Sequence, residues 1–444
     1  MIGKMRTSVS RHFNNTRNIV ANGKILEVLF RNELHKIITA ILSQGILSVS
    51  NFVIGILMAK YASKSEYGMY VILFSFIGIM GGYQGGFINA PLMALVNAKK
   101  EDEKRIYVSS LSAGKNFLFV PALLLISSAM ILYGFVNHIQ GYYIKEGIVV
   151  FLVAFLYLSK EFFRTLQYVS MNTNGILRID LANVVPVFAG MVLLVYLDAV
   201  TSLTGILVLG FGYFAAYLLS RRGNLYYAPV TGESIKNAMK ENWNHGKWVV
   251  LGVTSSLVQD RGYIYIVSAL LGLSALAEIS AARLFLMPIG LLAFSSARIA
   301  VAKGSKMVSL KENKEYQEFI FSFISVLLII WFLYFLFVLL TSNMFIGFLG
   351  GKYSNTQNLI YLWGTFFFVY IVRVLLGTVM VVYREFRKQA NYDMVGSALA
   401  IISCFVLINT VGRTGAIISL IIGETATMIL YLKMYDDIKK EVKQ

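Results

Sequence analysis

Apolar residues fill twelve long stretches of the chain, separated by shorter polar segments. Each stretch has about 20 residues or more, the length that an α-helix needs to cross a hydrocarbon layer about 30 Å thick. Unpaired backbone groups are not tolerated in that layer, so helices are the expected form. The pattern predicts an all-α integral membrane protein with twelve transmembrane helices, over residues 37–59, 68–97, 106–133, 147–168, 179–197, 201–220, 248–271, 276–301, 317–341, 358–383, 391–411 and 414–432.

Lysine and arginine are unevenly distributed among the connections between these stretches. Of the 40 Lys and Arg residues, 28 lie in the N-terminal arm, the even-numbered connections and the tail, five in the odd-numbered connections, and seven within the stretches. Basic residues favour the cytoplasmic side of a membrane. We therefore expect both termini to be cytoplasmic. The net charge of +17 is then mostly juxtamembrane charge facing anionic lipids, and no nucleic-acid partner is expected.

The longest connection on the basic side divides the stretches into two sets of six. We expect pseudo-symmetric lobes around a central cavity. The arm shows no cleavable signal peptide, and its apolar residues between Ile25 and Leu34 fall roughly on one helical side, as in an interfacial helix. The expected segments are a basic arm over 1–36, a six-helix lobe over 37–220, a cytoplasmic linker over 221–247, a second six-helix lobe over 248–432 and a tail over 433–444.

The sequence offers no platform for catalysis. The connections predicted to face outward are short, and the largest covers residues 342–357. All four histidines lie outside the apolar stretches, and Cys404 is the single cysteine, so no intramolecular disulfide can form. The motifs of zinc proteases, serine hydrolases and nucleotide-binding lysine loops do not occur, nor does a Cys/His cluster with metal spacing. We predict no enzymatic activity, no cofactor and no metal.

Basic residues inside the apolar stretches carry the strongest functional signal. A central Lys or Arg facing lipid costs about 2.5–3.5 kcal/mol on insertion scales. Lys160, Arg164 and Arg298 lie near the predicted cytoplasmic ends and can extend to the headgroups. The remaining four lie deeper, and we expect them to face a water-filled cavity between the lobes. They are Lys115, Arg261, Arg283 and Arg373.

Two acids, Asp260 and Glu424, lie within the seventh and twelfth stretches. A competing interpretation is that each deep cation only neutralises an intramembrane acid. These acids, even with Glu161 near the end of the fourth stretch, are too few for seven cations. The cavity is therefore expected to be positive and its cargo anionic.

Glycine and proline interrupt several stretches. The second contains a glycine-rich run from Gly78 to Gly86, and Pro121, Pro186 and Pro288 fall within the third, fifth and eighth. Such residues permit close helix approach or bending. Close packing accounts for most of them, and some are candidates for transport hinges.

The segment from Ala59 to Tyr70 joins the first two stretches and contains Glu66-Tyr67-Gly68. It resembles the first loop, and the opening of the second helix, of polysaccharide flippases of the Wzx and PST type, within the multidrug/oligosaccharidyl-lipid/polysaccharide exporter superfamily. The second region resembles the family's seventh and eighth helices, and it contains in order Asp260-Arg261, Leu271-Gly272, Ala281-Ala282-Arg283 and Pro288. The similarity in span number and spacing covers nearly the whole chain.

The resemblance implies a specific cargo. This is an undecaprenyl-pyrophosphate-linked oligosaccharide repeat unit, moved from the inner to the outer leaflet of a bacterial inner membrane. It is then assembled into O-antigen, capsule or exopolysaccharide, with polymerase and chain-length proteins as possible partners. Because the chain has no nucleotide-binding motif, coupling to an ion gradient or to downstream consumption is expected. Asp260 and Glu424 are the candidate coupling acids.

Alternative functions stay open. A multidrug or cation antiporter shares the twelve-helix plan, but a cationic cargo favours an acidic lumen, whereas the first three stretches hold Lys115 and no acid. A flippase for lipid-linked peptidoglycan precursors is similar too, but that family usually has fourteen helices. A membrane polysaccharide polymerase or glycosyltransferase is a more distant possibility.

Overall fold

The computed structural model describes residue 39 and residues 42–136, 142–222 and 228–443. In these ranges the chain consists of helices joined by short turns and contains no strand. The all-α prediction is thus confirmed. The interfacial helix expected within residues 1–36 lies outside the described residues.

The described residues of the twelve apolar stretches are helical almost throughout, although the eighth stretch is divided between two helices at residues 285–286. Nine helices of the described residues are long and apolar enough to cross a membrane, or ten if the bent pair α9–α10 counts as one span. The N-terminal half contains the helix Leu42–Tyr61, α2 (Lys64–Gln84), η1 (Gly85–Asn89), α3 (Ala90–Leu95), η2 (Val96–Ala98), α4 (Glu101–Val136), α5 (Tyr142–Val169), α6 (Thr173–Tyr196) and α7 (Ser202–Arg222). The C-terminal half contains α8 (Gly232–Leu271), α9 (Leu273–Leu284), α10 (Met287–Ser309), α11 (Asn313–Phe348), η3 (Ser354–Thr356), α12 (Gln357–Val382), α13 (Phe386–Val411) and α14 (Arg413–Lys443).

Local sequence explains where these helices begin, bend and end. The Ser63 side chain accepts a hydrogen bond from the Glu66 N–H and caps α2. Gly272, with φ of +82°, separates α8 from α9, a conformation that favours glycine. Pro121 lies inside α4, as Pro186 lies inside α6, so neither ends its helix. Pro288 is different, because it lies in the first turn of α10, where the chain bends by 60° after α9.

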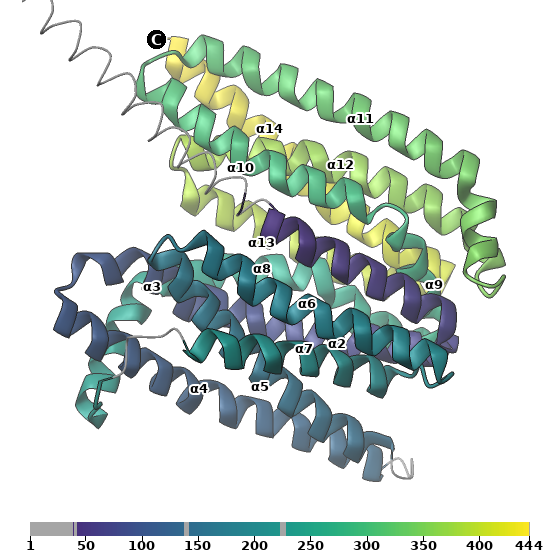
Figure 1. Cartoon of the computed structure of the whole chain (residues 1–444). Coiled ribbons are helices and arrows are strands. Elements are labelled where there is room, and N and C mark those ends of the chain that lie inside the picture. The colour runs from purple at the N-terminus through teal and green to yellow at the C-terminus, as the bar shows by residue number, and fades with distance from the viewer. Residues whose placement is uncertain (1–38, 40–41, 137–141, 223–227, 444) are drawn as a thin grey trace, which may run out of the picture.

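The helices form two groups with a seam between them (Figure 1). Helices α4–α7 form one group, and α10–α14 form the other. The remaining long helices, which are Leu42–Tyr61, α2, α8 and α9, lie near the seam between the groups. Helix α8 runs unbroken from the expected linker into the seventh predicted stretch. Its first half packs on α4, where Met239 fills the space beside Gly114, and its second half packs on α13. Helix α8 therefore joins the two groups.

Polar contacts link the N-terminal and C-terminal halves at the end that we predict to be external. Glu278 of α9 forms ion pairs with Lys64 of α2, at 2.6 Å, and with Arg413 of α14. Lys352 donates hydrogen bonds to the carbonyl oxygens of Lys60 and Ala62, at 2.7 and 2.8 Å. Partial burial lowers the pKa of Lys352. The seam is therefore closed at this end by side chains from both halves.

Candidate functional site

A cavity of about 250 Å³ lies in the seam between the two halves. Five helices supply its walls, namely the helix Leu42–Tyr61, α2, α8, α9 and the first residue of α10. Its charged lining residues are Asp260, Arg261 and Arg283, three of the residues that the sequence singles out. The rest of the wall is mainly apolar, tyrosine and small polar side chains, including Asn51, Tyr67, Tyr70, Phe74 and Ser75.

Arg261 of α8 extends across the seam to α2. Its Nη1 lies 3.4 Å from the carbonyl oxygen of Ser75, a long hydrogen bond. Its guanidinium group lies against the backbone at Gly78, where a Cβ would be 2.8 Å from the guanidinium carbon. The glycine-rich run of α2 thus provides the space in which the arginine lies. This is a packing role for one of the glycines that the sequence marks.

Arg283 of α9 is oriented by aromatic residues. Its Nη1 donates to the Tyr263 hydroxyl at 3.3 Å, and its guanidinium carbon lies 5.1 Å from the ring centre of Trp363. Trp363 is fully buried and donates to the carbonyl oxygen of Ile279 at 3.0 Å, so its ring is fixed in place. A cation over an aromatic face is stabilised without a counter-charge. The arginine therefore keeps its donor capacity for a ligand.

The charge of this cavity is positive. Asp260 is exposed to it and lies close enough to Arg283 for electrostatic interaction. Within the described residues, neither Arg261 nor Arg283 forms an ion pair with any carboxylate. Two guanidinium groups against one carboxylate leave an excess of one positive charge. In a low-dielectric wall such an excess attracts anions.

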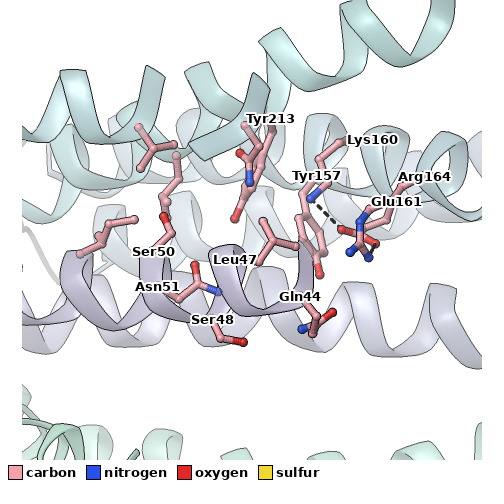
Figure 2. Close-up of a pocket in the computed structure, with 14 residues that line it drawn as sticks. Gln44, Leu47, Ser48, Ser50, Asn51, Tyr157, Lys160, Glu161, Arg164 and Tyr213 are labelled. Carbon is pink, nitrogen blue, oxygen red and sulfur yellow. Dashed lines mark ion pairs between the residues drawn. The ribbon is translucent and has the colours of Figure 1, made fainter. Parts of the chain in front are cut away.

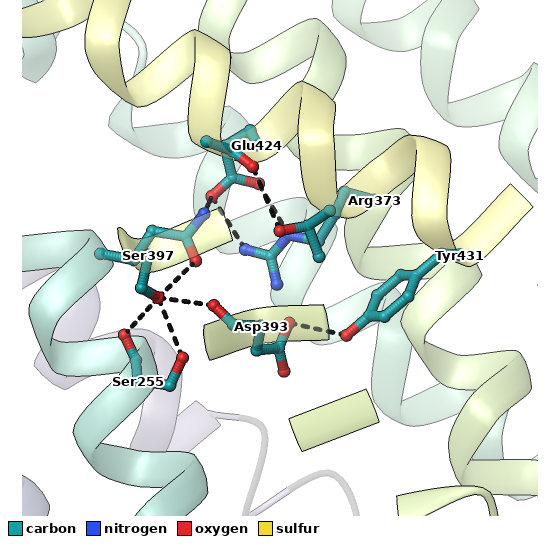
Figure 3. A network of polar contacts seen from close by, with 9 residues as sticks. Ser255, Arg373, Asp393, Ser397, Glu424 and Tyr431 are labelled. Atoms are coloured by element: carbon teal, nitrogen blue, oxygen red, sulfur yellow. Dashed lines mark hydrogen bonds and ion pairs between the residues drawn. The ribbon is translucent and has the colours of Figure 1, made fainter. Parts of the chain in front are cut away.

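Arg373 and Glu424 lie apart from this cavity, inside the C-terminal half. Glu424 of α14 is completely buried and accepts two hydrogen bonds from Arg373 of α12, at 2.7 and 3.0 Å. Gln259 of α8 donates a third at 2.7 Å. Figure 3 shows Asp393 beside this pair, bonded to the Tyr431 hydroxyl at 2.7 Å. Arg373 is therefore neutralised by a partner from another helix and does not line the cavity.

Lys115 of α4 also lies away from the seam. Its ammonium group is buried inside the N-terminal half, 3.3 Å from the Ser159 hydroxyl and 5.8 and 5.7 Å from the ring centres of Phe155 and Phe162. Hydropathy gives the depth of a residue in the membrane, but not the side of the helix on which it lies. Lys115 and Arg373 were expected in the central cavity, but neither lines the cavity at the seam.

Lys160 and Arg164 differ from their expected position as well. Lys160 is 2% exposed and pairs with Glu161 at 2.7 Å, so it does not extend to the headgroups. Arg164 forms a two-pronged ion pair with the fully buried Asp180 of α6, at 2.8 and 2.9 Å. Asp180 is an acid that the sequence interpretation missed, as is Asp393. Each lies near the end of a predicted stretch, where a charged residue does not indicate a buried ion pair.

No group of three or more metal-ligating side chains occurs within the described part of the chain. No protein-family model matches the sequence, and no curated protein matches it either. Solved structures do match in fold. An inward-facing multidrug resistance MATE family transporter of the MOP superfamily aligns with a TM-score of 0.70 and 13% identity, over 91% of this chain and 99% of that chain.

Two further solved structures share this fold. The lipid II flippase MurJ, in an inward closed conformation, aligns with a TM-score of 0.69 and 14% identity, over 90% of this chain and 87% of that chain. A MOP superfamily transporter from Pyrococcus furiosus, described as having a binding pocket of reverse polarity, aligns with a TM-score of 0.59 and 12% identity, over 92% of this chain and 95% of that chain. The chain therefore has the multi-pass membrane fold of MOP superfamily transporters.

Proposed function

We propose that this protein is a flippase for an anionic lipid-linked cargo, and that the cargo is an undecaprenyl-pyrophosphate-linked oligosaccharide repeat unit. The cavity at the seam carries the proposal. Arg261 and Arg283 line it without an ion pair to any described carboxylate, and each guanidinium can give paired hydrogen bonds to phosphate oxygens. The fold is shared with a lipid II flippase, which supports a lipid-linked cargo.

A multidrug or cation antiporter is the second candidate, because a MATE family transporter shares the fold over most of both chains. The charge of the cavity disfavours it. A cationic cargo would meet two arginines against the single carboxylate of Asp260. Polarity is a reasonable criterion within this fold, since a related transporter is described as having a pocket of reverse polarity. An enzymatic role has no support from the described side chains.

The cellular setting follows from the proposed cargo. The protein would lie in a bacterial inner membrane with both termini in the cytoplasm, and would deliver the repeat unit for O-antigen, capsule or exopolysaccharide assembly. Polymerase and chain-length proteins would be its functional partners. Transport would be coupled to an ion gradient, with Asp260 at the cavity or Glu424 in the buried pair as the coupling acid.

Transport in proteoliposomes tests the proposal. Purified protein is reconstituted with the fluorescent lipid-linked oligosaccharide, and the fraction reaching the opposite leaflet is measured against a cationic dye in parallel. We expect the oligosaccharide to move and the dye not to move. Arg261→Gln and Arg283→Gln should each reduce the rate at least tenfold, or about 1.4 kcal/mol.

Arg298→Gln is the matched control. Arg298 also lies within an apolar stretch, but it is exposed on α10, rests on the Phe294 ring and lines neither of the cavities described. Its replacement removes the same charge and should leave transport near the wild-type rate. Movement of the dye but not of the oligosaccharide would favour the antiporter instead.

A further inference from the structure

A second cavity, of about 230 Å³, lies within the N-terminal half (Figure 2). The polar side of the helix Leu42–Tyr61 faces it, with Gln44, Ser48 and Asn51, and residues of α5, α6 and α7 form the opposite wall. Asn51 lines both this cavity and the one at the seam. The two cavities are therefore adjacent. We call the second one the N-lobe chamber.

The charges of the N-lobe chamber are paired, in contrast to those at the seam. Lys160 is paired with Glu161, and Arg164 with Asp180 behind it. Asp180 also accepts a hydrogen bond from Ser43, which ties the first helix to α6. With two cations and two carboxylates, the chamber has no net charge to attract an ion. It does present donors and acceptors in fixed positions.

Asn183 of α6 lines the chamber and is 7% exposed. Its side-chain Oδ1 makes no hydrogen bond to any other described residue, and it lies against α7, where a Cβ built on Gly212 would be 2.7 Å away. This oxygen is therefore packed between α6 and α7, and the other polar groups of the lining define what the chamber can bind.

The remaining lining groups define the chemistry of a ligand in the chamber. Amides, hydroxyls and a carboxylate face the same space as two cationic groups, so both donors and acceptors are needed from the ligand. Sugar hydroxyl groups supply both from a single oxygen. Tyr157 and Tyr213, with ring centres 5.1 Å apart, add flat apolar surface for the C–H face of a sugar ring.

We propose that the N-lobe chamber binds the saccharide part of the cargo, while Arg261 and Arg283 bind its diphosphate in the adjacent cavity. This inference rests on the proposed function, because it assigns two parts of one cargo to two adjacent cavities. The division follows the charges: the unpaired arginines face the anionic group, and the neutral chamber faces the hydroxyl groups.

Binding of two probes to the full-length protein in nanodiscs tests the inference. The first probe is undecaprenyl diphosphate without sugar. The second carries the oligosaccharide repeat unit, extracted from the cells in which the chain occurs. We expect the wild type to bind the second probe at least tenfold more tightly. Gln44→Leu and Asn183→Leu keep the side-chain size and remove the polar atoms, so each should reduce that ratio several-fold.

Two further variants serve as references. Arg261→Gln should weaken the binding of both probes by the same factor and leave the ratio of the two affinities unchanged. Asn409→Leu, at an exposed position on α13 outside both cavities, should match the wild type. Thermal unfolding of each variant checks that it is folded. Two chamber positions are changed separately, so that a folding defect in one leaves the other informative.

The outcomes separate this inference from the proposed function. Equal binding of both probes by the wild type, or chamber variants that keep the wild-type ratio, would mean that the chamber holds only water and would overturn the inference alone. In that case, binding of the bare diphosphate that depends on Arg261 would still support the flippase. If the wild type bound neither probe, both the proposed flippase function and the saccharide-binding chamber would be refuted.

Discussion

A Cβ built on Gly78 of α2 would lie 2.8 Å from the guanidinium carbon of Arg261 on α8, closer than real side chains come. Glycine at this position therefore allows the arginine to lie against the backbone of α2 and to approach the Ser75 carbonyl oxygen. The contact joins the two halves of the molecule at the wall of the charged cavity. A substitution of Gly78 can therefore displace the side chain of Arg261 while the arginine itself is kept.

Gly78→Ala should therefore move Arg261 while the bundle stays folded, because the atoms that must shift are the far end of a flexible side chain. We expect transport of the lipid-linked cargo to fall about tenfold, or about 1.4 kcal/mol. Gly85→Ala is the control, since a Cβ there meets nothing within 4 Å. Equal transport by the two variants would show that the position of Arg261 is unimportant.

A disulfide between α2 and α9 should lock the end of the seam that we predict to be external. The hydroxyl oxygens of Ser65 and Ser274 lie 3.4 Å apart, so cysteines there can approach bonding distance with little movement. Ser65→Cys/Ser274→Cys, once oxidised, should stop transport if the two halves must separate at this end, and reduction should restore it.

The single-cysteine variants are the controls for the disulfide, and the native Cys404 is buried and should not interfere. Crosslinking is measured by mass spectrometry before and after reduction. Full transport by the completely crosslinked protein would show that this end of the seam does not open during the cycle.

Hydropathy alone predicts most of the fold. The described parts of the twelve apolar stretches are almost entirely helical, because burying backbone groups in lipid leaves few alternatives to helices, and only the eighth is divided, between α9 and α10. Bends were harder to anticipate. Pro186 lies within a continuous helix, whereas Pro288 lies at a 60° bend. The difference depends on how neighbouring helices pack, and a single sequence does not show that packing.

The candidate site was predictable only in part. The depth of a charge in the membrane is readable from the sequence, and Asp260, Arg261 and Arg283 do meet at one cavity. The depth of a residue does not show which helices pack against one another. Arg373 therefore could not be assigned to its partner Glu424, nor could Lys115 be placed among aromatic rings inside one half. The N-lobe chamber was missed because Lys160 and Arg164, which line it, were expected to extend to the headgroups.

Topology can be checked independently of transport. The distribution of basic residues predicts that residues 140 and 348 are external and that residues 232 and 310 are cytoplasmic. Reporter enzymes that are active on one side only, fused at each of the four positions, should follow that pattern. Reversal at any two positions would contradict the predicted orientation of the chain.

Glu424 and Asp260 provide the last prediction, which concerns energy coupling. Glu424 is fully buried and held by Arg373 and Gln259, whereas Asp260 is open to the cavity. An acid that carries an ion or a proton must change its state when the cavity changes its exposure. Asp260→Asn and Glu424→Gln are compared with the wild type for uptake of lipid-linked sugar into proteoliposomes, with and without an ion gradient.

We expect one of these variants to lose the dependence on the gradient while keeping downhill exchange of cargo. Removing only one member of the buried pair is costly, about 3–5 kcal/mol, because the other charge stays in the interior. Glu424→Gln/Arg373→Gln should recover part of the stability that Glu424→Gln loses, and melting temperatures measure this. If both single variants keep full gradient dependence, neither acid couples transport, and the Arg373–Glu424 pair only stabilises the fold.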